Sequence, residues 1–173
     1  VATFDSSSVR IYRPRSDFFI RIRRPGHLKE GAMKGINFGR VILGGIVAGI
    51  LINISEFVLN EKVLKSDWDA ALKAMGKSMT GDSAILVWIL YGFVLGIAAV
   101  WLYAAIRPRY GAGAGTAARA GVAVWFFQSF LPTVAQANLA LFPRNILMTA
   151  CVWALVELII ATVLGAWLYR EAA

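Results

Sequence analysis

Four long apolar stretches limit the fold of this chain more than any other feature. They are residues 41–59, 84–106, 120–142 and 146–168. At ~1.5 Å of rise per helical residue, each stretch is about 28–35 Å long, which matches the roughly 30 Å hydrocarbon core of a bilayer. Each is apolar around its whole circumference, unlike an amphipathic helix on a soluble protein. The sequence therefore predicts an all-α polytopic membrane protein with four transmembrane helices in an antiparallel bundle.

The composition supports a membrane protein and argues against a metal or disulfide site. Of the 173 residues, 58% are hydrophobic and 16% are charged, whereas a soluble domain is about half apolar and about a quarter charged. Cys151 is the only cysteine and His27 the only histidine. A single cysteine forms no internal disulfide, and one histidine with one cysteine makes a poor metal site. We therefore expect no metal and no cofactor.

The basic residues are unevenly distributed, and their distribution predicts the orientation in the membrane. Residues 1–40 contain half of the 18 lysines and arginines, and the connection 107–119 carries three arginines and no acid. The connection 60–83 balances lysines against acids. Because basic loops stay on the cytoplasmic side, both termini are predicted to be cytoplasmic, in a bacterial inner membrane. Contact with anionic lipid head groups is an alternative role for the basic arm. Nucleic-acid binding is not expected, since no nucleic-acid-binding fold accompanies the arm.

The N-terminal residues differ from the rest of the chain. Residues 1–32 are polar and rich in arginine, and Met33-Lys34 comes shortly before the first apolar stretch. They lack the apolar core and the small-residue cleavage site of a signal peptide. We expect a flexible basic tail over residues 1–32, not needed for the fold, and a membrane domain over residues 33–173.

The first connection contains a helical pattern of its own. Its apolar residues recur at spacings of three and four, which predicts a helix over about residues 62–79: Leu64, Trp68, Leu72, Met75 and Met79. One interpretation is an amphipathic helix on the outer membrane surface. The alternative is a cap folded over the outer end of the bundle.

Six polar side chains inside the predicted membrane helices are the candidate intramembrane site. They are Asn53, Glu56, Gln128, Gln136, Asn138 and Glu157. A charge at mid-bilayer costs about 2.5–3.5 kcal/mol on insertion scales, so Glu157, halfway along its helix, is expected to face the bundle interior. The last two apolar stretches are joined by a tight turn. A hydrogen bond between Gln128 and Glu157 is therefore expected.

Small residues predict where the helices approach closely. Gly45 and Gly49 have the Gly-x-x-x-Gly spacing that lets membrane helices pack with their backbones near one another. Four further small residues are expected to serve the same packing: Gly92, Gly96, Ala161 and Gly165. On the first and last helices these small residues share a face with acidic ones.

The layout resembles a family of uncharacterised small bacterial four-helix integral membrane proteins, a domain of unknown function. The likeness covers about residues 36–169 and rests on a Gly-rich first helix and on four short segments: Lys65-Ser66-Asp67-Trp68, Leu141-Phe142-Pro143-Arg144, Leu155-Val156-Glu157 and Leu164-Gly165-Ala166-Trp167. The resemblance implies the four-helix fold. It transfers no catalytic residue, because no activity is established for the family.

Three functions are weighed for such a chain. The favoured one is a non-enzymatic accessory, binding or structural bundle, whose partners are the lipid bilayer and a second copy or another membrane protein. The alternative is a small channel or transporter subunit with a proton or cation relay, or a polar ligand site, around Glu157. A lipid-modifying enzyme is the weakest, since the sequence offers no Ser/His/Asp set and no metal cluster. The polar residues would otherwise serve only packing, at roughly 0.6 kcal/mol per interhelical hydrogen bond.

Overall fold

The computed structural model describes residues 35–78 and 81–171, and the predicted tail over residues 1–32 lies outside them. Within these ranges the chain is all-helical and contains no strand, so the predicted all-α class is confirmed. The elements are α1 (Phe38–Val58), the π-helical segment η1 (Leu59–Val63), α2 (Lys65–Ala74), α3 (Gly81–Tyr110), α4 (Ala114–Trp125), the π-helical segment η2 (Phe126–Phe130), α5 (Leu131–Asn138) and α6 (Arg144–Trp167).

Three of the described helices are long and apolar enough to cross a membrane. They are Phe38–Val63, Ala84–Tyr110 and Arg144–Trp167, and they coincide, to within a few residues at their ends, with three of the four predicted stretches. The remaining stretch is helical through α4, η2 and α5 as far as Asn138. Polar residues such as Gln128 and Gln136 lower its hydropathy, and it is not among the three.

A change of helix type interrupts the stretch over residues 120–142. Residues Phe126–Phe130 form π turns, and α5 then begins at Leu131 with Pro132 in its first turn. Proline has no N–H to donate to the carbonyl four residues earlier, so a regular α-helical ladder is broken at this point. The π segment contains Gln128 and Ser129, the two most polar residues near the middle of the stretch.

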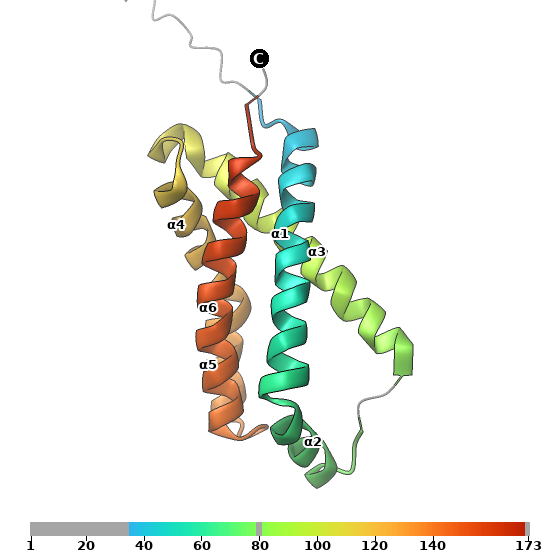
Figure 1. Ribbon diagram of the computed structural model, residues 1–173. Helices are drawn as coiled ribbons and strands as arrows, with labels where there is room; N and C mark the ends of the chain where they lie inside the picture. Colours follow the sequence, from blue (N-terminus) through green and yellow to red (C-terminus); the bar gives the residue numbers. More distant parts are fainter. Residues whose placement is uncertain (1–34, 79–80, 172–173) are drawn as a thin grey trace, which may run out of the picture. The chain divides into compact units, whose positions relative to one another are not determined.

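The described helices pack around α1 and α6. In Figure 1, α1, α6 and the α4–α5 segment lie beside one another, while α3 crosses α1 obliquely, so that its first half diverges from the other helices. The core between them is rich in small residues, including Ala48, Ala117, Ala120 and Ala161, all of which are fully buried. The side chains of α3 from Ile85 to Tyr91 are exposed, as expected for a segment that contacts lipid.

Glycines mark the closest approaches between helices. A Cβ atom on Gly96 of α3 would lie 2.5 Å from the Gly45 carbonyl oxygen and 2.5 Å from the Gly49 nitrogen of α1. On the other side of α1, a Cβ atom on Gly165 of α6 would lie 2.6 Å from the Gly44 carbonyl oxygen. Backbone therefore meets backbone at both contacts, and no larger residue fits without movement of a helix.

The two ends of the described unit are each held by contacts between elements distant in sequence. At one end, the Asn37 N–H donates to the Tyr169 hydroxyl (3.4 Å), and Arg107 at the end of α3 pairs with Glu171 (3.3 Å). The start of α1 and the ends of α3 and α6 therefore lie together. At the other end, the Trp68 ring of α2 packs edge-on against Phe142, with ring centroids 5.2 Å apart.

The helix of the first connection is shorter than the predicted 62–79, because η1 precedes it and α2 ends at Ala74. Leu64 and Ala71 are buried in a small cluster with Leu59 and Ile146. The apolar side of α2 is therefore covered by η1 and the start of α6. On the exposed side, Glu61 accepts a hydrogen bond from Lys65 and attracts it, which raises the pKa of the Lys65 ammonium group.

Candidate functional site

Glu157 is a carboxyl group buried in the middle of α6. It is 5% exposed and lies among the buried α6 residues Ala154, Leu158 and Ala161. Within the described part of the chain, its Oε2 atom has no hydrogen-bond partner. Buried polar atoms nearly always have such a partner. The unpartnered Oε2 atom therefore makes Glu157 the leading candidate for a site.

Two residues of α1 face this carboxyl group. The Ser55 hydroxyl lies within hydrogen-bonding reach of Glu157, and Glu56 is near enough for the two carboxylates to interact through their charges. Trp153, one turn before Glu157 on α6, donates its Nε1–H to Ser55 Oγ (2.8 Å). We call these four residues, Ser55, Glu56, Trp153 and Glu157, the α1–α6 polar site.

A chain of hydrogen bonds connects the α1–α6 polar site to α2. Asn60 Nδ2 donates to Glu56 Oε2 (2.7 Å) and to the Glu56 carbonyl oxygen (2.9 Å). Trp68 Nε1 in turn donates to Asn60 Oδ1 (3.0 Å). Asn60 lies in the π segment η1, a helix type that often occurs at functional positions. Hydrogen-bonded polar groups therefore lead from α2, at one end of the described unit, towards the buried Glu157.

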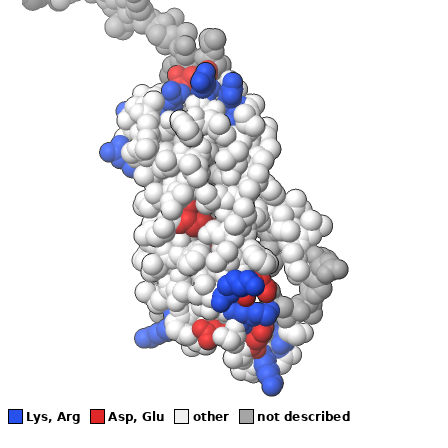
Figure 2. Space-filling view, in the orientation of Figure 1, with Lys and Arg blue, Asp and Glu red and all other residues white. Residues whose placement is uncertain are grey.

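The α1–α6 polar site contains two acidic residues, and the described ion pairs bring no basic residue to it. The ion pairs among the described residues are Lys65–Glu61 and Arg107–Glu171, and neither involves Glu56 or Glu157. Figure 2 shows Lys and Arg gathered towards the two ends, with acidic atoms appearing in the otherwise uncharged middle. The described charged residues of the neighbouring helices are Arg107 and Arg109 in the last turn of α3 and Arg119 in α4, whose guanidinium group lies over the Tyr110 ring. The two carboxylates therefore share an apolar region without a basic partner.

Two of the predicted site residues make contacts elsewhere. Asn53 Nδ2 donates to the carbonyl oxygens of Gly49 (2.8 Å) and Ile89 (3.2 Å), so it links α1 to α3. The expected hydrogen bond between Gln128 and Glu157 is not found among the described residues: Glu157 Oε2 has no partner, and Gln128 Oε1 accepts from the Ser129 hydroxyl. The physical reason is η2: a π turn changes the angular step per residue, so the face occupied by Gln128 does not follow from α-helical spacing.

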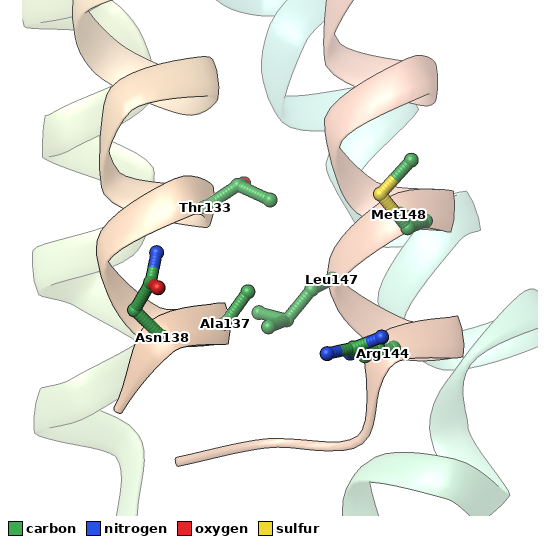
Figure 3. Close-up of a pocket in the computed structure, with 6 residues that line it drawn as sticks. All are labelled: Thr133, Ala137, Asn138, Arg144, Leu147 and Met148. Carbon is green, nitrogen blue, oxygen red and sulfur yellow. The ribbon is translucent and has the colours of Figure 1, made fainter. Parts of the chain in front are cut away.

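Asn138 belongs to a separate, open pocket of about 290 Å³ between the end of α5 and the start of α6. Figure 3 shows its lining residues, with Thr133 and Ala137 on the α5 side opposite Leu147, Met148 and Arg144 on the α6 side. Asn138 Nδ2 donates to the Val134 carbonyl oxygen (2.8 Å). Gln136 is half-buried on the same helix. The six predicted polar residues are therefore divided among several places, and only Glu56 and Glu157 come together.

Four participating residues were not predicted from the sequence: Ser55, Asn60, Trp68 and Trp153. Asn60 had a local signal, because it follows Glu56 by four residues and so lies on the same helical face. Trp153 precedes Glu157 by the same spacing. Ser55 and Trp68 had no such signal, because their contacts depend on how α1, α2 and α6 pack.

Neither a metal cluster nor a known relative assigns a chemistry to this site. Over residues 35–78 and 81–171, no three His, Cys, Asp or Glu side chains come together in a group that could hold a metal ion. No protein-family model, no curated protein and no solved structure matches the chain.

Proposed function

We propose that the protein is a four-span integral membrane protein of a bacterial inner membrane, with both termini in the cytoplasm. The support comes from whether the number of membrane crossings is odd or even. The start of α1 lies beside the end of α6, as the Asn37–Tyr169 hydrogen bond requires. Three crossings by α1, α3 and α6 would leave those two ends on opposite sides of the membrane, whereas four crossings return the chain to its starting side.

The crossing that this proposal adds to α1, α3 and α6 is the run of α4, η2 and α5. From Ala114 to Asn138 it is continuously helical, and at ~1.5 Å per residue it is roughly 37 Å long, enough for a bilayer. It packs along α6. Its lower hydropathy fits a helix whose polar residues face protein. The basic connection 107–119 then lies on the cytoplasmic side, as the positive-inside rule requires.

Cysteine labelling in intact cells tests this topology. In a Cys151→Ala background, single cysteines at Lys77 and Leu141 should react with a membrane-impermeant maleimide from outside. A cysteine at Ala112 should react only after the cells are permeabilised. All three positions are exposed in the structure. If Leu141 were protected in the same way as Ala112, the α4–α5 segment would not cross the membrane and the four-span proposal would fail.

Within this architecture, we propose that the protein is not an enzyme and acts by non-covalent binding at the α1–α6 polar site, as an accessory or binding protein. The observation that carries this proposal is the unpartnered Oε2 atom of buried Glu157. An ionisable group inside a membrane domain is costly, and it is rarely found there without a functional partner. A residue used only for packing would not need the charge, because an amide could make the same hydrogen bonds.

A second candidate, a proton or cation relay in a channel or transporter subunit, is favoured by the chain from Trp68 through Asn60 to Glu56. A proton-flux assay in proteoliposomes separates the two. A binding protein should give the same background flux with the wild type as with Glu157→Gln. A relay should give a wild-type flux that the substitution reduces at least ~10-fold, since the substituted amide carries no titratable proton. The matched control is Glu61→Gln, which removes an exposed carboxylate outside the site.

A further inference from the structure

We propose that the α1–α6 polar site binds one monovalent cation, which is either a proton or an alkali-metal ion. The inference rests on the proposed function, because it names the class of ligand for that binding site. It goes further by stating the charge of the ligand and the atoms that contact it.

The first argument is the missing positive charge. Glu56 and Glu157 lie near one another in an apolar region, and their carboxylates repel each other when both are charged. The described ion pairs bring no basic side chain to either of them. The described charged groups of the adjoining helices are Arg107 and Arg109 in the last turn of α3, Arg119 in α4, which lies over the Tyr110 ring, and Glu61 and Lys62 on η1. The other titratable side chains of these helices and α6, such as Tyr91, Tyr103 and Cys151, bring no positive charge. A positively charged ligand therefore compensates the carboxylate charge that no described basic side chain neutralises.

The second argument gives the number of charges. The Glu56 carboxylate already accepts a hydrogen bond from Asn60 (2.7 Å), which stabilises its negative form. Glu157 Oε2 accepts none. Glu56 can therefore keep its negative charge, while Glu157, whose Ser55 contact leaves Oε2 without a partner, takes the ligand, and a single positive charge removes the repulsion between the two carboxylates.

The third argument concerns the donor atoms. The oxygens that face the ligand are those of Glu157, Glu56 and the Ser55 hydroxyl, whose own oxygen accepts from Trp153. Carboxylate and hydroxyl oxygens are hard donors. Calcium requires six to eight such ligands, and magnesium keeps several waters around it, so neither divalent ion suits a buried site with so few oxygens. A proton needs only one oxygen, and an alkali-metal ion brings the single positive charge that the second argument requires, whereas calcium and magnesium each bring two.

Thermal unfolding of the purified full chain in detergent micelles tests the proposal. Tryptophan fluorescence is recorded in sodium, potassium and choline chloride at equal ionic strength, and in choline chloride over a pH series. Choline, a bulky quaternary ammonium ion with no proton to donate from nitrogen, serves as the reference cation. The wild-type Tm should rise in one arm, by roughly 5–10 °C at about 100 times the Kd of the bound cation. The responding arm identifies a sodium ion, a potassium ion or a proton.

The variants locate the response. Glu157→Gln and Glu56→Gln should each abolish it, while Glu61→Gln, which removes an exposed carboxylate, should keep it. A wild-type Tm that is equal in every arm overturns the proposal, and so does an unchanged response in Glu157→Gln. If Glu157→Gln does not fold, the response of Glu56→Gln decides by the same comparison. The measurement is made in micelles, so a failure of the four-span topology and a failure of cation binding are told apart.

Discussion

Replacing Gly96 with alanine is expected to destabilise the protein by about 2–3 kcal/mol, because the added methyl group has no room. Its Cβ atom would lie 2.5 Å from both the Gly45 carbonyl oxygen and the Gly49 nitrogen. These are backbone atoms of α1, so no side-chain rotation relieves the contact, and the two helices must separate. The expected fall in Tm is roughly 5–10 °C, measured by tryptophan fluorescence in detergent micelles.

Gly39→Ala is the matched control. It is the same chemical change in α1, but its Cβ atom would meet only Asn37 Oδ1, at 3.6 Å, which is an ordinary contact. Because alanine has a helix propensity up to about 1 kcal/mol better than that of glycine, this variant should keep or slightly raise the Tm. An equal loss in the two variants, or no loss at Gly96, would show that the close approach of α1 and α3 does not stabilise the fold.

The glycines also show how far sequence patterns specify packing. The Gly-x-x-x-Gly spacing at Gly45 and Gly49 predicts that some helix approaches α1 closely. It does not say which helix. In the structure α3 approaches these glycines through Gly96, and α6 approaches the adjacent Gly44 through Gly165. Gly44 was not predicted, because the spacing rule treats one face of the helix and α1 uses two.

For the candidate site, the sequence predicts the acidic residues inside apolar helices better than it predicts the residues that contact them. Glu157 and Glu56 stand out because acidic groups are rare in apolar stretches. The residues that accompany them are ordinary in composition, and they come together only through the packing of α1, α2 and α6. The expected contact of Gln128 with Glu157 fails for a different reason: Gln128 lies within the π turns of η2, so its orientation does not follow from regular α-helical spacing.

The first connection illustrates the same limit. Its helical pattern predicts a helix and allows either a membrane-surface helix or a cap. The burial of Leu64 and the contact of Trp68 with Phe142 support the cap. Only the tertiary structure carries this information, because the apolar face of α2 would have the same sequence against lipid as against protein. The hydrogen bond from Trp68 to Asn60 then connects the cap to the α1–α6 polar site.

Glu157→Gln is expected to stabilise the protein when no cation that fits the site is present. The amide has nearly the shape of the carboxylate, and the substitution breaks no hydrogen bond at Oε2, which has no partner among the described residues. It removes an uncompensated charge from an apolar region, where such a charge costs about 1–3 kcal/mol or more. The Tm in choline chloride, at a pH where the carboxyl group is ionised, should therefore rise by roughly 3–10 °C.

Two further variants show whether this gain comes from the charge. Glu61→Gln neutralises an exposed carboxylate in an i,i+4 surface pair, and should change the stability by no more than about 0.5 kcal/mol. Glu157→Ala also removes the charge, but it leaves a cavity beside Ser55 and Leu158, so it should be less stable than Glu157→Gln. A lower Tm for Glu157→Gln than for the wild type in choline would mean that the carboxylate is already satisfied by the protein. The stabilising amide and the destabilising cavity together separate the charge of Glu157 from its volume, which no single substitution at this position can do.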